Sequence, residues 1–171
     1  MPTGQVPGYA SGVSVSPSPA ESARAAEPEL AALPEDAVLV LYDGVCALCN
    51  GLVRFLLARD RQDRIRFAAL QSELGRRVVA ARGGDPDALS TLYLIERPGR
   101  PDERVWTRGR AGARALALPG GLWWAAGALR VLPDVLLDLG YGMVARLRYR
   151  LAGRLDACPV PPPEHRHRFL A

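Results

Sequence analysis

The chain has 171 residues, 49% of them apolar, and a formal net charge of +4. This length suits one domain with extensions, and the apolar content is sufficient for a buried core. All 22 basic residues are arginine and they are scattered, so the sequence does not indicate a nucleic-acid-binding protein. Three cysteines are too few for a disulfide-stapled secreted domain, and "MPTGQVPGYASG" lacks the features of a signal peptide, so we expect a cytoplasmic, reducing location.

The first part of the chain is predicted to be a disordered leader. Residues 1–36 are rich in Pro, Ser, Gly, Ala and Glu and have no periodic apolar pattern. The only regular structure expected there is a short helix near the end. Such a composition cannot bury enough surface to offset its ordering entropy. We therefore expect one folded domain over residues 37–171.

An alternation of strands and helices follows the leader. Residues 38–42 form an apolar run that is typical of a strand buried on both faces. The next segment, "CALCNGLVRFLLARD", has apolar residues at helical spacing and carries two cysteines in its first turn. Strands are then predicted over 64–70, 90–96 and 103–109, the last two as a hairpin, and a helix over 72–84 with Ser72 as N-cap.

The C-terminal third is predicted to be helical, with breaks at Pro119, Pro133 and Gly140. An uncharged run over 115–129 is too short to span a membrane, which takes about 20 apolar residues. We interpret it as a buried helical hairpin. Peripheral membrane contact through Trp123-Trp124, beside Arg146, Arg148 and Arg150, is a less favoured alternative.

The pattern Cys46-Ala-Leu-Cys49 predicts a thiol–disulfide exchange site. Residues three apart at a helix start lie within one turn of each other. The N-terminal end of a helix stabilises an anion, which lowers the pKa of a thiol there. We therefore expect Cys46 to be an exposed attacking thiolate and Cys49 to lie inward and resolve the mixed disulfide. Asp43 either holds the turn and caps the helix or exchanges a proton with Cys49.

Two other interpretations of the pair remain open. Cys46 and Cys49 are half of a zinc site if Cys158 and His165 or His167 complete it, which would make the protein a zinc-stabilised interaction module. The pair can also be two inert core thiols. Its position after a buried strand favours redox chemistry. No G-x-G-x-x-G loop is present, so no organic cofactor is expected.

The segment "YDGVCALCNGLVRFLLARD" resembles the opening signature of the DCC family of predicted thiol-disulfide oxidoreductases, named for an Asp-Cys-Cys set matched here by Asp43, Cys46 and Cys49. The likeness continues through "RIRFAALQS", "ALSTLYLIE" and "YRLAGRLDACPVPPPEHRHRFL". It implies a thioredoxin-like α/β fold, here a βαβαββ core with a helical C-terminal extension. It also implies that Cys46 and Cys49 are the active pair and that Asp43 is the third signature position, but it implies no substrate. From the cysteine pair we predict exchange with protein or small-molecule thiols and disulfides.

Two positions qualify the resemblance. Cys158 belongs to the C-terminal part of the likeness, where it can be buried, can pack near the site or can act as a third redox thiol; we favour burial. Thioredoxin-like proteins usually have a cis-proline just before the third strand. Here Ser90-Thr91 occupy that place, so we do not expect the substrate backbone to dock in the usual manner.

Overall fold

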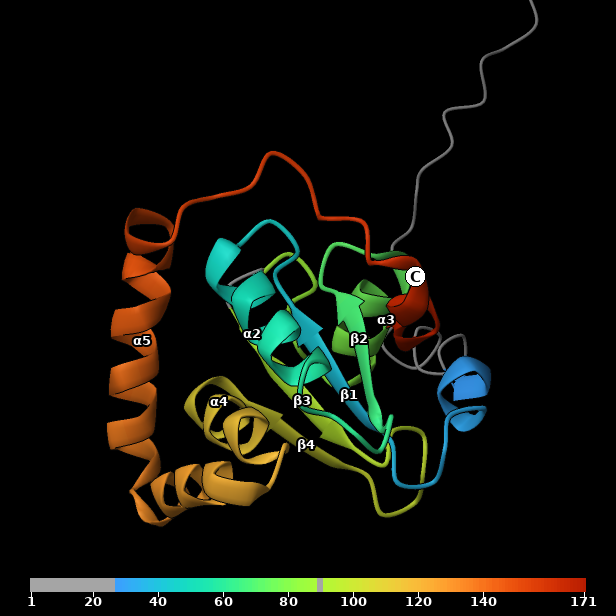
Figure 1. The fold of residues 1–171 in the computed structure, drawn as a ribbon, viewed down its shortest axis with the longest axis horizontal. Helices are drawn as coiled ribbons and strands as arrows, with labels where there is room; N and C mark the ends of the chain where they lie inside the picture. The colour runs from blue at the N-terminus through green and yellow to red at the C-terminus, as the bar shows by residue number, and fades with distance from the viewer. Residues whose placement is uncertain (1–26, 89–90) are drawn as a thin grey trace, which may run out of the picture.

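The computed structural model describes residues 27–88 and 91–171 and contains a five-stranded sheet in the order β4-β3-β1-β2-β5 (Figure 1). Its strands are β1 (Val38–Tyr42), β2 (Ile65–Ala69), β3 (Tyr93–Glu96), β4 (Arg104–Thr107) and β5 (Phe169–Leu170). β1 pairs parallel with β2, and β2 with β5, whereas β1 with β3 and β3 with β4 are antiparallel. The helices are α2 (Ala47–Leu57), α3 (Glu73–Ala81), α4 (Arg108–Ala117) and α5 (Asp134–Leu151), with 3₁₀ segments η1 (Gly121–Val131) and η2 (Pro163–Arg168).

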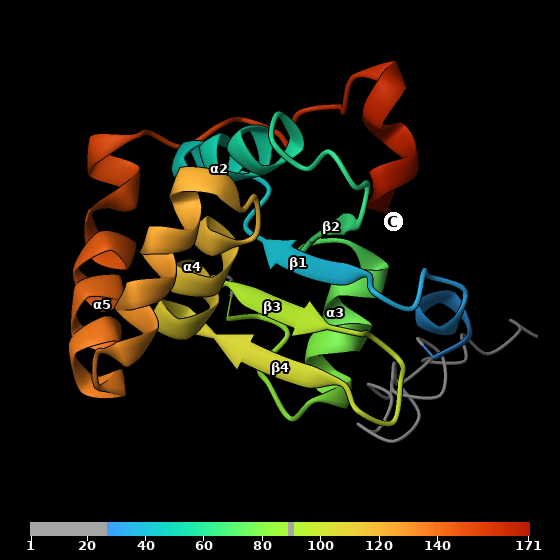
Figure 2. The ribbon, with the colours of Figure 1, turned by 60° about the horizontal axis from the view of Figure 1, so that its bottom comes forward.

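Two hydrophobic cores lie on opposite faces of the sheet, because side chains alternate along a strand. Leu39 and Leu41 of β1 pack against α3, whereas Val38, Val40 and Tyr42 pack against α2 and α4. Figure 2 shows the sheet between these layers, with α5 outside α4. This arrangement confirms an α/β class consistent with a thioredoxin-like fold. Because β1 is buried on both faces of the sheet, its sequence is a continuous apolar run.

The element order follows the prediction through α4 and differs after it. α5 continues through Gly140, so the predicted break there is wrong. One glycine costs a helix only about 1 kcal/mol relative to alanine, which tertiary packing readily offsets. The sequence also gave no sign of β5, since a two-residue strand is too short for a periodic pattern to reveal it.

The predicted disordered leader falls mostly on residues outside those described. Its last part is packed: residues 27–31 are helical, and Leu30, only 1% exposed, lies in the core beside α3. The packed part of the chain therefore begins before residue 37.

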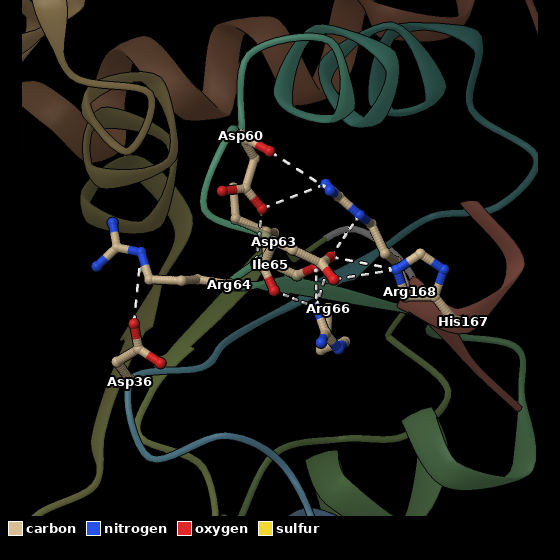
Figure 3. Close-up of polar contacts among 8 residues, drawn as sticks. All are labelled: Asp36, Asp60, Asp63, Arg64, Ile65, Arg66, His167 and Arg168. Carbon is tan, nitrogen blue, oxygen red and sulfur yellow. Dashed lines mark hydrogen bonds and ion pairs between the residues drawn. The ribbon is translucent and has the colours of Figure 1, made fainter. Parts of the chain in front are cut away.

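The C-terminus is held to the sheet by ion pairs (Figure 3). Arg168 is buried and contacts Asp60 at 3.3 Å and Asp63 at 2.7 Å, while His167 Nε2 lies 3.1 Å from Asp63 Oδ2. Burial opposes ionisation of Asp63, but the hydrogen bond with His167 and the charges of Arg168 and Arg66 hold the pKa of this carboxyl below its usual value. These contacts fix β5 against β2.

Gly75 allows α3 to pack directly on the end of β2. A Cβ at this position would lie 2.1 Å from the carbonyl oxygen of Ala69. We expect Gly75→Ala to lower the free energy of unfolding by about 1–3 kcal/mol, since backbone must move. Gly112→Ala in α4, where a Cβ meets nothing within 4 Å, should instead be neutral or stabilising by up to about 1 kcal/mol. Urea unfolding of both variants tests this pair, and equal effects would contradict it.

No helix within the described residues is both long and apolar enough to cross a membrane. Trp123 is 42% exposed, and its ring packs edge to face on Phe55 at 4.7 Å between centroids. Arg148, one of the three arginines of the less favoured membrane-contact alternative, is buried.

Candidate redox site

The Asp-Cys-Cys set lies where β1 ends and α2 begins. Cys46 is the N-cap residue of α2, and Cys49 follows in the first turn, as the sequence predicts. The Cys46 N–H donates to the Asp43 carbonyl oxygen at 3.2 Å, which closes the turn between strand and helix. All three cysteines of the chain are free thiols in the structure.

Asp43 is buried and its carboxylate organises the turn from two sides. Oδ1 accepts hydrogen bonds from the Val45 N–H at 3.2 Å and from Gln71 Nε2 at 2.8 Å. Oδ2 accepts from Arg148 Nη2 at 3.2 Å and from the Tyr149 hydroxyl. The bond to Val45 is the two-residue contact typical of aspartate in turns. Asp43 thus holds the turn, while the N-cap position of α2 is occupied by Cys46, which makes no side-chain cap hydrogen bond.

Two amide side chains complete the support of this turn. Gln71 Oε1 accepts from the Gly44 N–H at 3.0 Å, so one side chain binds both Gly44 and Asp43. The buried Asn50 donates through Nδ2 to the carbonyl oxygens of Gly44 at 2.7 Å and Cys46 at 3.0 Å. These bonds keep the cysteine-bearing turn in one conformation.

Cys46 is 0% exposed, contrary to the exposure expected for an attacking thiol. A C-terminal segment, residues 153–155, lies antiparallel along the turn and covers it. Arg154 forms a β-bridge with Cys46, the Ala47 N–H donates to the Gly153 carbonyl oxygen at 3.3 Å, and the Leu155 N–H donates to the Val45 carbonyl oxygen at 2.8 Å. We call residues 153–155 the covering segment. No local sequence signal connects them to the turn.

Cys49 is partly buried and borders an open apolar cleft. The cleft has a volume of about 700 Å³ and is lined mainly by side chains of α2, α4 and α5, among them Leu52, Leu116 and Val144. Burial raises the pKa of the Cys49 thiol to about 12, helped by the negative charge of Cys46 and a hydrogen bond with it. The Asp43 backbone and Arg148 oppose this shift. Cys49 is therefore a neutral thiol at pH 7.

This raised pKa predicts the pH dependence of Cys49 alkylation. In the reduced, folded protein the rate with iodoacetamide should rise about tenfold per pH unit from pH 7 to 10, because only the thiolate reacts. In urea-unfolded protein the rate should level off above about pH 9, since the ordinary pKa is about 8.5. Mass-spectrometric mapping of the modified cysteine gives both profiles. A plateau below pH 9 in the folded protein would contradict the raised pKa.

Cys158 is exposed, so the expectation that it is buried is wrong. Its Sγ nevertheless lies at the turn, 3.7 Å from the Tyr42 hydroxyl. A Cβ on Gly44 would lie 2.8 Å from the same sulfur. The chain reaches this position because the covering segment continues along the turn toward the end of β1.

The alternative zinc site is not assembled. Within residues 27–88 and 91–171, no group of three or more His, Cys, Asp or Glu side chains is placed to hold a metal ion. His167 contacts Asp63, which precedes the start of β2, whereas Cys46 follows the end of the parallel strand β1. The two ends of the sheet separate these residues.

The backbone at the start of β3 is bound from within the chain. The Leu92 N–H donates to the Tyr141 hydroxyl of α5 at 2.9 Å. Ser90, which the sequence places where a cis-proline is usual, lies outside the described residues. The expectation about how a substrate backbone docks here stays a prediction.

Four supporting residues were not found from the sequence. Gln71, Arg148 and Tyr149 contact Asp43, and Asn50 contacts Gly44 and Cys46. Arg148 and Tyr149 lie more than 100 positions from Asp43, so no spacing rule joins them. Only Asn50, four residues after Cys46 on the same helix, has a spacing that could have suggested its contact.

Comparison with known proteins agrees with this geometry. Residues 40–154 match the model of the DCC1-like thiol-disulfide oxidoreductase family, and the chain belongs to that family. It is 33% identical to the uncharacterized protein YuxK of Bacillus subtilis over 77% of this chain and 93% of that protein. It is 37% identical to a chloroplastic DCC family protein of Arabidopsis thaliana over 71% of this chain and 69% of that protein. No solved structure matches significantly.

Proposed function

We propose that the protein is a thiol–disulfide oxidoreductase that exchanges electrons between the Cys46/Cys49 pair and the disulfides of a protein or small-molecule partner. The observation that carries the proposal is the position of both thiols in the first turn of α2, with Cys46 at the N-cap. The N-terminal end of a helix carries a partial positive charge that stabilises nearby negative charge. Membership of a family named for this chemistry also supports the proposal.

In the reducing direction, the Cys46 thiolate attacks one sulfur of the partner's disulfide and expels the other as a thiolate. Cys49 then loses its proton and attacks the Cys46 sulfur, which releases the partner's second thiolate. Two electrons pass from the pair to the partner, and two protons end on the partner's thiols. Once Cys46 is in a mixed disulfide its negative charge is gone, so one cause of the raised Cys49 pKa disappears.

Asp43, Arg148 and Tyr149 act as positioning residues. Asp43 fixes the turn that carries Cys46, and the two α5 side chains bind its carboxylate on the side away from Gln71. The charge of Arg148 also favours the Cys49 thiolate. The scarcity of cysteines suits a reducing compartment such as the cytoplasm, where catalytic rather than structural disulfides are usual.

A glutathione redox titration of metal-free protein tests the proposal, with acid quenching, differential alkylation and peptide mapping. We expect a reversible two-electron couple between Cys46 and Cys49, whose midpoint gives the direction of electron flow. If both thiols stay reduced at every ratio of oxidised to reduced glutathione, the proposal fails.

A further inference from the structure

The burial of Cys46 leaves open how a partner's disulfide reaches the pair. Cys46 is 0% exposed under the covering segment, and Cys49 has a pKa of about 12, which makes it a poor nucleophile at neutral pH. Cys158 is exposed and lies beside the same turn. It is also beyond residue 154, where the match to the family model ends.

Gly44 makes room for the Cys158 sulfur. A Cβ at residue 44 would lie 2.8 Å from Cys158 Sγ and 3.1 Å from its Cβ, so a larger residue would displace this cysteine. The φ angle of Gly44 is not positive, and the backbone itself therefore does not require glycine here. What the glycine supplies is the close approach of a third sulfur to the turn that carries Cys46.

Tyr42, the last residue of β1, also contacts Cys158. Its hydroxyl lies 3.7 Å from Cys158 Sγ. Burial raises the pKa of Tyr42, and the neighbouring Cys158 and Cys49 raise it further, since both side chains lie near the phenol. The exposed thiol and the redox pair thus share one small region at the end of β1.

We propose that Cys158 is a third redox thiol, which takes up a partner's disulfide at the surface and passes it to Cys46. This inference rests on the proposed function of the pair. It is favoured by the antiparallel run that opposes Arg154 to Cys46 and Leu155 to Val45, because the same run carries Cys158 to the turn.

The relay balances in three exchanges, each a thiolate attack on a disulfide sulfur. The Cys158 thiolate attacks the disulfide of a partner protein or of glutathione, expelling one partner thiolate and forming a mixed disulfide. Cys46 attacks the Cys158 sulfur, expels the second partner thiolate and forms a disulfide with Cys158. Cys49, after losing its proton, attacks the Cys46 sulfur and frees Cys158. Two electrons leave the pair, and the partner gains two electrons and two protons.

A trapping experiment tests the central step. In full-length Cys49→Ser protein the last exchange is blocked, so oxidation with glutathione disulfide should accumulate an internal disulfide between Cys46 and Cys158. Non-reducing peptide mapping detects it. The double variant Cys49→Ser/Cys158→Ser is the control and should stop at glutathionylated Cys46 or free thiol. Failure of the internal disulfide to form in folded Cys49→Ser protein would overturn the proposal.

A rate measurement separates the relay from the function of the pair. We expect Cys158→Ser to reduce a protein disulfide at least about tenfold more slowly, with the midpoint of the Cys46/Cys49 couple unchanged. Ala157→Ser, which adds a hydroxyl at the neighbouring exposed residue, should behave as the wild type. An unchanged rate in Cys158→Ser would overturn the relay and leave the proposed function standing. Absence of any Cys46/Cys49 couple in the wild type would instead remove the proposed function.

Discussion

Replacing Arg148 with methionine is expected to lower the free energy of unfolding by about 3–5 kcal/mol. The Arg148 side chain is 7% exposed and that of its partner Asp43 only 1%, so the substitution leaves a buried carboxylate without its opposite charge. The contact between Arg148 and the Tyr149 hydroxyl is lost at the same time. Urea unfolding followed by tryptophan fluorescence measures the change.

Two companion variants make this result specific. Arg76→Met removes an exposed ion pair with Asp87 and should cost less than about 1 kcal/mol. The double variant Asp43→Asn/Arg148→Met removes both charges, so its loss should be smaller than the sum of the two single losses. If Arg148→Met lowers the free energy of unfolding no more than Arg76→Met does, the buried pair does not stabilise the turn between β1 and α2.

Cys46→Ser is expected to reduce the rate of protein-disulfide reduction by about a thousandfold or more, because a hydroxyl cannot replace the thiolate in either exchange. The double variant Cys46→Ser/Cys49→Ser should be no slower, since residues that act as a unit have non-additive effects. An insulin-reduction assay with circular dichroism as a folding check measures both. A single variant that keeps more than a tenth of the wild-type rate would contradict the assignment of Cys46.

The part of the fold that the sequence predicted is the part with local signals. The apolar run of β1, the helical spacing of α2 and the Ser72 cap each act within a few residues, and the Ser72 hydroxyl accepts the Gly75 N–H as expected. The cysteine pair was predictable for the same reason. The parallel pairing of β1 with β2 follows from the helix between them.

What the sequence did not predict depends on contacts between distant segments. The ion pair of Asp43 with Arg148 joins residues 105 positions apart, and the cover over Cys46 comes from residues 153–155. Because α5 contains several arginines, its sequence does not indicate which of them is buried. The sequence analysis therefore expected Cys46 to be exposed and Cys158 to be buried, whereas the structure shows Cys46 buried and Cys158 exposed.

The covering segment is one side of a loop that is tied at both ends. On one side α5 binds Asp43 through Arg148 and Tyr149, and on the other Arg168 and β5 hold the C-terminus to the sheet. We expect the segment in between to open locally without unfolding of the core, because both ties lie outside it. Lifting breaks the two backbone hydrogen bonds of Ala47 and Leu155, each worth about 0.5–1.5 kcal/mol.

This energy sets the fraction of molecules that present Cys46 directly to solvent. A cost of about 1–3 kcal/mol corresponds to roughly one open molecule in six to one in 160 at equilibrium. A partner that attacks Cys46 directly reacts only with that fraction, and its rate is reduced accordingly. If the proposed relay through Cys158 operates, a more tightly held covering segment would slow direct attack on Cys46 and would leave entry through Cys158 unaffected.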